Sequence, residues 1–390
     1  MENSLSNLKI LDFSTLLPGP YATLMLADMG AEVLKIASKS KYDLVLESGY
    51  RAENGKTANL MWLGRNKKSM SLNLKTPEAI EIIKKLILEY DILVEQFRPG
   101  VMEKLGLSYE TLKEINPKLI YVSISSYGQT GPMKNRAGHD INFLSLSGIM
   151  NSSGRKSTGP SLINTQIGDL AGGALHGIIG LLAAVNYRNV TGVGQHVDIS
   201  MLDALIPLNT LNGINYLSTS EEPKREEEIF NGGNIYDFYQ TSDDKYMSVA
   251  SLEPKFLNSF CEILNLPDLL KEGAFTQNTE IKNNLKSIFK TKTQAEWIEI
   301  FSKYDCCVEP VLSYEEAFTS PQVVAREMIV ELKDGDKSYR QFANPIKFSV
   351  SKNRYDHVGY EIGKDNLNVL KNLGYSEKEI EELANKDVFK

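Results

Sequence analysis

Residues 8–36, LKILDFSTLLPGPYATLMLADMGAEVLKI, decide the fold. The apolar run at 8–13 predicts a buried strand, and a second run at 31–36 predicts another. Between them, residues 21–29 are apolar on one face, with proline in the first turn and glycine after the last, which is typical of a helix. A strand, a helix and a strand in this order imply parallel pairing. We therefore predict a β-α-β unit at the start of the chain.

The alternation of helices and strands continues downstream. Helices are expected at 78–90, 109–115 and 170–187, and strands at 92–97, 119–124 and 196–200. This order predicts an α/β fold with a parallel sheet covered by helices. No GxGxxG stretch follows the first strand, so the usual dinucleotide cradle is not predicted.

The composition changes near Ser218, where a charged, exposed linker begins. After it, residues 236–240 and 245–251 flank a polar turn and predict a hairpin, which helical segments follow. Capping-box spacing marks three later helix starts, at Thr293, Ser313 and Ser376. We expect four parts: a large domain at 1–200, a linker at 201–228, a small α+β domain at 229–320 and a C-terminal segment at 321–390.

Bulk composition narrows the class of protein. The chain has 390 residues, 42% of them hydrophobic and 24% charged, which indicates a globular protein large enough for two domains. A net charge of −7 argues against a general binder of nucleic acid or of membrane surfaces. The longest apolar run, at 177–185, is too short to span a bilayer, and the first eight residues lack an apolar signal core. We expect a cytoplasmic protein.

Cysteine and histidine usage gives no metal or disulfide framework. The three cysteines, Cys261, Cys306 and Cys307, contain no CxxC pair, and reduced thiols are expected. The four histidines are dispersed, so no metal site is predicted.

Asp169 stands out among the polar residues because glycine precedes it and an apolar helix follows. A carboxylate at this place is most often a helix N-cap. It can also be a reactive group near backbone N–H groups and the positive end of the helix dipole. Two further residues have equally ordinary local readings: His139 as a structural histidine and Glu253 as an exposed glutamate at the end of a strand.

Several blocks, taken in order, resemble class III CoA-transferases of the CaiB/BaiF type, and within them the α-methylacyl-CoA racemases. The resemblance runs from about residue 8 to the C-terminal helix. The blocks are Leu11-Asp-Phe-Ser-Thr-Leu-Leu-Pro-Gly-Pro-Tyr21, Leu26-Ala-Asp-Met-Gly-Ala-Glu-Val33, Gly64-Arg-Asn-Lys-Lys-Ser69, Leu72-Asn-Leu-Lys75, Phe97-Arg-Pro-Gly-Val-Met-Glu-Lys-Leu-Gly106, Ala137-Gly-His-Asp-Ile-Asn142, Gly168-Asp-Leu-Ala-Gly-Gly173, Thr191-Gly-Val-Gly-Gln-His-Val-Asp198 and Leu252-Glu-Pro-Lys-Phe256.

The resemblance implies a Rossmann-like large domain and a smaller α+β domain, with residues 321–390 returning to the large domain. It also implies an interlocked homodimer, in which the site lies between the large domain of one subunit and the small domain of its partner. The substrate would be an acyl-CoA thioester, with no cofactor beyond the CoA that the substrate carries.

The resemblance further implies a catalytic set of His139, Asp169 and Glu253. A histidine and a carboxylate suit 1,1-proton transfer at the α-carbon of a 2-methylacyl-CoA, because one group removes the proton while the other delivers one to the opposite face. Backbone N–H groups at 168–170 are expected to stabilise the enolate. One alternative is a CoA-transferase that moves CoA between carboxylic acids through an anhydride on Asp169. A less favoured alternative is a non-enzymatic acyl-CoA-binding homologue.

Binding of CoA would fall to a separate set of residues. Those expected to contact CoA are Arg65, Leu72, Lys75, Arg98, Gly138 and Asp140. The chain departs from the racemases at Ala37-Ser38, where they carry an acidic residue and then an arginine, and at Val193, where lysine is frequent. We expect Lys35, Lys39 or Lys41 to substitute for the missing arginine.

Overall fold

The computed structural model describes residues 3–390, which divide into two compact units. The larger unit contains the residues up to Phe143 together with Gln166–Leu205 and Gln322–Lys390, and the smaller unit contains Leu144–Thr165 and Ile206–Pro321. These boundaries differ from those expected from sequence, because the chain leaves the larger unit once within 1–200. The predicted linker at 201–228 also contains two helices, α9 (Met201–Leu208) and α10 (Thr210–Thr219).

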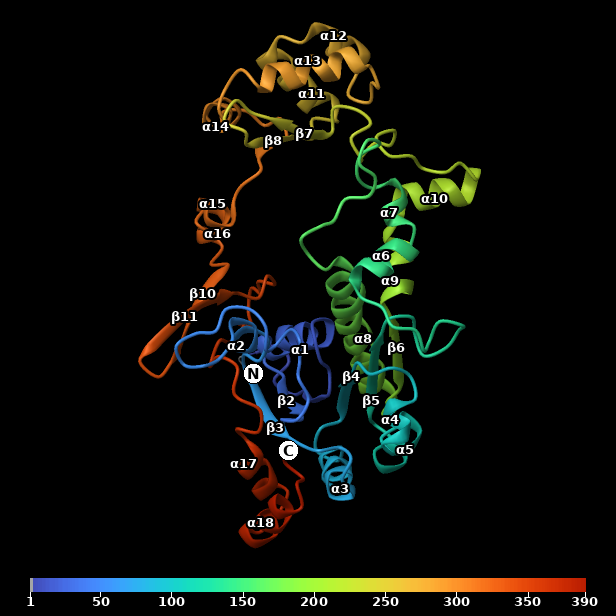
Figure 1. Ribbon diagram of the computed structural model, residues 1–390, viewed down its shortest axis with the longest axis vertical. Coiled ribbons are helices and arrows are strands. Elements are labelled where there is room, and N and C mark those ends of the chain that lie inside the picture. Colours follow the sequence, from blue (N-terminus) through green and yellow to red (C-terminus); the bar gives the residue numbers. More distant parts are fainter. Residues whose placement is uncertain (1–2) are drawn as a thin grey trace. The chain divides into compact units, whose positions relative to one another are not determined.

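A six-stranded parallel sheet forms the centre of the larger unit, which confirms the predicted fold class (Figure 1). Its order is β3-β2-β1-β4-β5-β6. The strands are β1 (Lys9–Asp12), β2 (Glu32–Ala37), β3 (Lys67–Ser71), β4 (Ile92–Glu95), β5 (Ile120–Ser125) and β6 (His196–Ser200). The strand order reverses between β1 and β4, and the carboxyl ends at such a reversal are where α/β sheets bind ligands.

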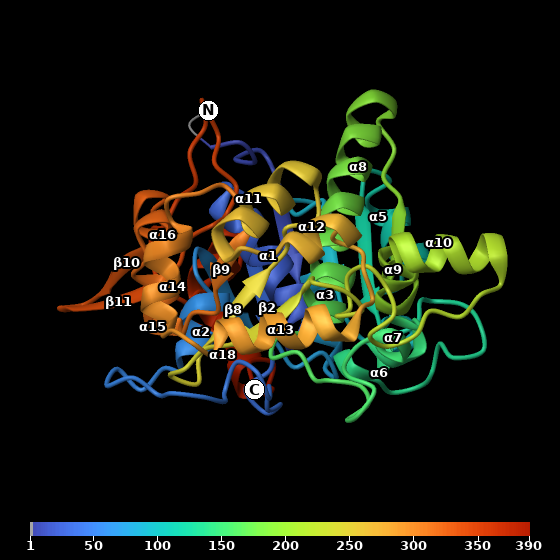
Figure 2. The same ribbon diagram turned by 90° about the horizontal axis from the view of Figure 1, so that it is seen from above.

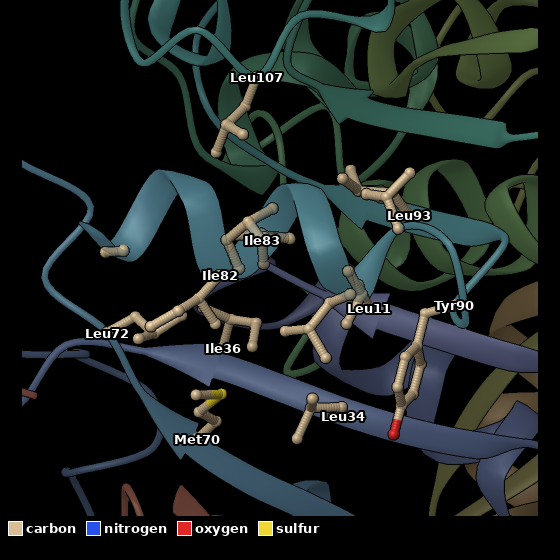
Figure 3. Packing of buried hydrophobic residues seen from close by; sticks show 14 of the residues in the cluster. Leu11, Leu34, Ile36, Met70, Leu72, Ile82, Ile83, Tyr90, Leu93 and Leu107 are labelled. Atoms are coloured by element: carbon tan, nitrogen blue, oxygen red, sulfur yellow. The ribbon is translucent and has the colours of Figure 1, made fainter. Parts of the chain in front are cut away.

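Helices cover the sheet because their apolar residues recur every three or four positions. In α3 (Pro77–Leu86), Thr76 caps the first turn and accepts a hydrogen bond from the amide of Ala79. Ile82 and Ile83 of this helix point toward strand residues of β1 and β2 (Figure 3). Burying each such side chain stabilises the fold by about 1.5–3 kcal/mol.

Further elements of the larger unit surround this core. They are α1 (Pro18–Asp28), α2 (Ala58–Leu63), α4 (Val101–Lys104), α5 (Tyr109–Ile115), α6 (Asp140–Leu146, ending in the smaller unit), α16 (Pro321–Ala325, starting there), the hairpin β10 (Ile329–Asp334) and β11 (Lys337–Phe342), α17 (Asn366–Asn372) and α18 (Glu377–Asn385). The C-terminal residues lie along β3, where the carbonyl of Phe389 accepts a hydrogen bond from the hydroxyl of Ser71 at 2.8 Å.

The predicted helix at 170–187 is a π-helix, η1 (Gly168–Leu175), that continues as the α-helix α8 (His176–Thr191). Residues Gly168–Thr191 together are long and apolar enough to cross a bilayer, which the apolar run at 177–185 did not indicate. In the larger unit this stretch packs on α1, β5 and β6, as the core helix of a globular domain does. Single turns of π-helix are rare and occur frequently at functional sites.

The smaller unit has its own sheet and its own core. Strands β7 (Asp237–Gln240), β8 (Tyr246–Val249) and β9 (Val308–Pro310) pair antiparallel, which confirms the predicted hairpin. Helices α11 (Pro254–Leu264), α12 (Pro267–Glu272), α13 (Thr279–Phe289) and α14 (Gln294–Phe301) lie over these strands (Figure 2). The unit also contains α7 (Ile149–Ser152) and α15 (Tyr314–Phe318). All three predicted capping boxes are present.

Candidate active site

A cavity of about 850 Å³ opens in the larger unit at the carboxyl ends of four neighbouring strands. Phe13 follows β1, Ala37 ends β2, Leu72 follows β3, and Phe97 follows β4, and all four line the cavity. We call it the main cavity. Its place at the reversal of strand order and its size suit a nucleotide-sized ligand.

A buried cluster of charges forms one wall of the main cavity. Lys35 and Lys67 lie 3.3 and 3.4 Å from the carboxyl oxygens of Asp12, which is fully buried. Burial alone would raise the pKa of Asp12, but the two lysines and hydroxyl donors hold that pKa at about 2. Burial lowers the pKa of Lys67 to about 8. These two lysines share the one carboxylate of Asp12 and therefore help to maintain the fold of this wall.

Other cations of the main cavity remain available. The side chains of Lys75 and Arg98 line it, and the structure of residues 3–390 gives neither an ion-pair partner. The ammonium of Lys41 lies 5.2 Å from the centre of the Phe97 ring, a cation–π contact. Lys39 does not line the cavity, so Lys41 is the best placed of the three lysines expected to replace the missing arginine.

The structure corrects the expectation for Arg65. This residue is 1% exposed and does not line the main cavity. Its Nη2 lies 2.6 Å from Oδ2 of Asp28, and its Nε donates to Oδ1 at 3.0 Å. A third nitrogen, Nη1, donates to the carbonyl of Phe342 at 2.8 Å. The guanidinium is therefore used to join α1 to β11 and is not available to a phosphate.

We predict that Arg65→Met destabilises the protein by about 3–5 kcal/mol, because it leaves the carboxylate of Asp28 buried and unpaired. Denaturant unfolding measures this loss. Arg340→Met serves as the control, since Arg340 is exposed on β11 and its replacement is expected to change stability by less than about 0.5 kcal/mol. Equal stability of the two variants would contradict the structural role of Arg65.

Gly138 shapes the turn that presents His139. A Cβ atom at Gly138 would lie 2.6 Å from both the hydroxyl of Tyr127 and the ring of Phe143, so only glycine lets the backbone pass over these rings. The next residue, His139, is exposed, and its backbone is fixed by two hydrogen bonds with Asn142. Glycine is therefore required at 138 because a larger residue would collide with these rings. Gly138 does not line the main cavity, so its expected contact with CoA is not supported.

The carboxylate of Asp140 joins the His139 turn to Asp169. Its Oδ1 accepts hydrogen bonds from the amides of Gly168 at 2.5 Å and Asp169 at 3.2 Å, at the first turn of η1. Asp169 itself is therefore not the cap of this helix. A Cβ at Gly168 would lie 3.0 Å from that oxygen, so glycine permits the close approach. The carboxylate next to His139 thus holds the backbone at Asp169, although the two residues lie far apart in the sequence.

The carboxyl group of Asp169 is mostly buried and has a carboxylate beside it. Burial and the negative charge of Asp140 together raise the pKa of Asp169 to about 7. Burial also raises the pKa of Asp140, although the amides of Gly168 and Asp169 oppose the rise. A carboxyl group with a pKa near neutrality exchanges protons readily in both directions.

Two expectations about this region change. The amides at 168–170 are not free to stabilise an enolate, because Gly168 and Asp169 donate to Asp140 and Leu170 donates to the carbonyl of Gln166 at 2.9 Å. Asp140 caps η1 and does not line the main cavity, so its expected contact with CoA gives way to a role in holding Asp169.

Glu253 belongs to the smaller unit, whereas His139 and Asp169 belong to the larger one. It is exposed at the N-cap position of α11, and its side chain makes no capping hydrogen bond. Its carboxylate is therefore available to another group.

The chain is similar in sequence to both racemases and CoA-transferases. A family model described as CoA-transferase family III matches residues 5–366. The α-methylacyl-CoA racemase of Homo sapiens is 32% identical, over 97% of this chain and 96% of the racemase. The succinyl-CoA:glutarate CoA-transferase of Mus musculus is 30% identical, over 97% of this chain and 88% of the transferase.

Solved structures of the same family share the fold. A CaiB/BaiF family protein from Brucella suis superposes with a TM-score of 0.83 at 26% identity, over 96% of this chain and all of that one (100%). The parallel sheet, its strand order and the match along most of the sequence agree with one another. The chain therefore belongs to CoA-transferase family III and is an enzyme of this superfamily of CoA-transferases and racemases.

Proposed function

We propose that this chain is an acyl-CoA racemase or epimerase that inverts the α-carbon of a 2-methylacyl-CoA by proton transfer between His139 and Asp169. The observation that carries this proposal is the bridge through Asp140, which ties the backbone of the His139 turn to the amide of Asp169. The human racemase, at 32% identity over 97% of this chain, supports the same reading.

Inversion requires a base on one face of the α-carbon and an acid on the other, and His139 and Asp169 are groups of different type that can fill these two roles. The thioester acidifies the α-proton, which neutral His139 removes from one face as the carboxyl form of Asp169 protonates the other. In the reverse direction, the carboxylate of Asp169 is the base and the imidazolium of His139 is the acid. A pKa of about 7 keeps both forms of Asp169 populated near neutral pH, so both directions can run.

We assign CoA to the main cavity, with Lys75 and Arg98 as partners of its phosphates. Lys41 would neutralise a third charge beside Phe97.

We also propose that Glu253 of a partner subunit completes the catalytic set in an interlocked homodimer. The uncovered apolar side chains of α10 support self-association, because Leu211, Ile214 and Leu217 are 55%, 62% and 78% exposed. The molar mass in solution tests this dimer.

The competing proposal is a CoA-transferase in which Asp169 attacks the thioester and forms an anhydride. The similarity to succinyl-CoA:glutarate CoA-transferase favours it. That reaction needs Asp169 as a carboxylate, and it needs no base on the opposite face of the α-carbon.

One experiment separates the two proposals. A single enantiomer of a 2-methylacyl-CoA is incubated with the protein in deuterated water without an acceptor acid. The racemase proposal expects deuterium at the α-carbon together with appearance of the opposite enantiomer. Absence of exchange, followed by rapid CoA transfer when a free carboxylic acid is added, would sink it in favour of the transferase.

We further predict that Asp140→Asn shifts the pH profile of inversion. Asparagine still accepts hydrogen bonds from the two amides but removes the negative charge that helps to raise the pKa of Asp169. Asp169 then loses its proton at lower pH. In the direction of inversion that uses Asp169 as the acid, the rate therefore begins to fall at a lower pH than in the native protein. Initial rates across a pH series give the midpoint, and an unmoved midpoint would show that Asp140 acts on Asp169 only through geometry.

A further inference from the structure

A second, smaller cavity of about 290 Å³ lies in the larger unit, outside the proposed catalytic groups. It is lined by residues of β4, β5, β6 and α5, with Glu95, Ser123, His196 and Tyr109 among them. Glu95 is 4% exposed, and the proposed reaction does not use it. Since this cavity has room for several waters, protons can reach the carboxyl group of Glu95.

Glu95 holds the backbone that follows β4. Its Oε2 accepts a hydrogen bond from the amide of Phe97 at 2.7 Å. Phe97 and Arg98 both line the main cavity, and Arg98 also lines the second cavity. The neighbouring Gln96 fixes the other side of this turn, because its Oε1 accepts from the amide of Gly19 at 2.9 Å. The side chain of Glu95 therefore orients the turn that presents Phe97 and Arg98.

The same carboxyl group begins a hydrogen-bond chain. Glu95 is paired with Ser123 in the sheet and shares a hydrogen bond with its hydroxyl, and Ser123 Oγ lies 2.9 Å from Nε2 of His196. Tyr109 stacks on the His196 ring at 5.5 Å, and Tyr121 meets it edge-on at 5.3 Å, so the ring cannot turn away freely.

A serine hydroxyl has one proton and can donate it in only one direction. When Glu95 is ionised, Ser123 donates to the carboxylate and accepts from Nε2–H of His196. When Glu95 is protonated, it can donate to Ser123, which then donates to an unprotonated Nε2. The chain therefore has two arrangements, and the ionisation of Glu95 selects between them.

We propose that Glu95 is a positioning residue whose carboxylate fixes the turn of Phe97 and Arg98, so that protonation of Glu95 weakens the binding of CoA. This inference rests on the proposed assignment of CoA to the main cavity. Its physical basis is that a hydrogen bond from an amide to a carboxylate is about twice as strong as one to a neutral carboxyl group. A neutral Glu95 holds the amide of Phe97 less firmly, and with it the turn that presents Arg98.

The surroundings of Glu95 determine the pH at which this change occurs. Burial raises the pKa of Glu95 to about 7, against the hydrogen bonds from Ser123 and Phe97, and the charge of Asp198 raises it further. The other ionisable residues that line the second cavity are Arg98, Glu103, Tyr109, Glu110, Tyr121 and His196. Because a raised pKa favours the neutral form, the carboxylate is present above about pH 7, and CoA binding weakens as the pH falls through that value.

The test is calorimetric titration of the full-length protein with free CoA at pH 6 and pH 8. The 3′-phosphate of CoA also titrates near pH 6, so each variant is compared with the native protein at the same pH. Glu95→Gln, a neutral mimic of the protonated side chain, is expected to bind CoA about fivefold more weakly than the native protein at pH 8 and equally at pH 6. Glu103→Gln, an exposed change in the same cavity, is the matched control and should keep native binding at both pH values.

Ser123→Ala provides a second readout that does not depend on how Glu95→Gln folds. Loss of the hydroxyl removes a donor that lowers the pKa of Glu95, so the midpoint of the pH dependence should move to higher pH. Native binding by Glu95→Gln at pH 8, or an unmoved midpoint in Ser123→Ala, overturns the inference. Because this binding assay needs no turnover, the two proposals fail separately. Absence of deuterium exchange refutes the proposed reaction alone. CoA binding that does not change with pH, in a protein that catalyses inversion, refutes the role of Glu95 alone.

Discussion

Asp169→Asn is expected to reduce the rate of α-carbon inversion by about 10²- to 10⁴-fold, the range that one positioned acid or base contributes. Asparagine has nearly the same size, and the backbone N–H of residue 169 still donates to Asp140, so the first turn of η1 should remain in place. What the substitution removes is the only proton that Asp169 can exchange at a pKa of about 7. The rate is measured as formation of the opposite enantiomer of a 2-methylacyl-CoA.

Two controls give this result its meaning. Asp203→Asn replaces an exposed aspartate of α9 and should leave the rate of inversion unchanged. Calorimetric titration with free CoA should show native affinity in Asp169→Asn, since Asp169 does not line the main cavity. Inversion at a near-native rate in Asp169→Asn would remove Asp169 from the mechanism. An acyl group trapped on Asp169 in the native protein would instead support the transferase.

The first β-α-β unit could be predicted because each of its elements is determined locally. The two apolar runs and the helix bounded by proline and glycine appear as β1, α1 and β2 with their expected parallel pairing. The strand β3 was missed because its sequence, Lys67-Lys-Ser-Met-Ser71, lacks the apolar run of a buried parallel strand. Its lysines are accommodated through Asp12 and Glu32, and no pattern local to β3 reveals these partners.

The candidate site could be predicted in part. His139 and Asp169 came from the family resemblance, since local sequence alone favoured ordinary roles for both. The function of Asp140 depends on a hydrogen bond to a residue 28 positions away, and the ion pair of Arg65 depends on one 37 positions away. Contacts at such separations are set by how the elements pack, and a single sequence carries no local signal for them. The close approaches that require glycine at 138 and 168 were not predicted either, because the local sequence does not show which side chains these glycines meet.

His139→Ala is expected to reduce inversion by a similar factor, about 10²- to 10⁴-fold, because only Asp169 then remains to move the proton. The two catalytic variants should differ in which enantiomer still exchanges its α-proton. Asp169 faces one side of the α-carbon in the proposed mechanism, so His139→Ala should exchange deuterium with retention into one enantiomer only. Asp169→Asn should do so with the other enantiomer.

This complementary pattern tests for two bases more sharply than loss of activity does, because a variant that has merely lost its fold exchanges neither enantiomer. Deuterium content and configuration are measured together after incubation of each pure enantiomer with each variant. Added imidazole should restore part of the inversion in His139→Ala and none in Asp169→Asn. Exchange into the same enantiomer by both variants would contradict the assignment of His139 and Asp169 to opposite faces, and would instead indicate a single base that reaches one side of the thioester.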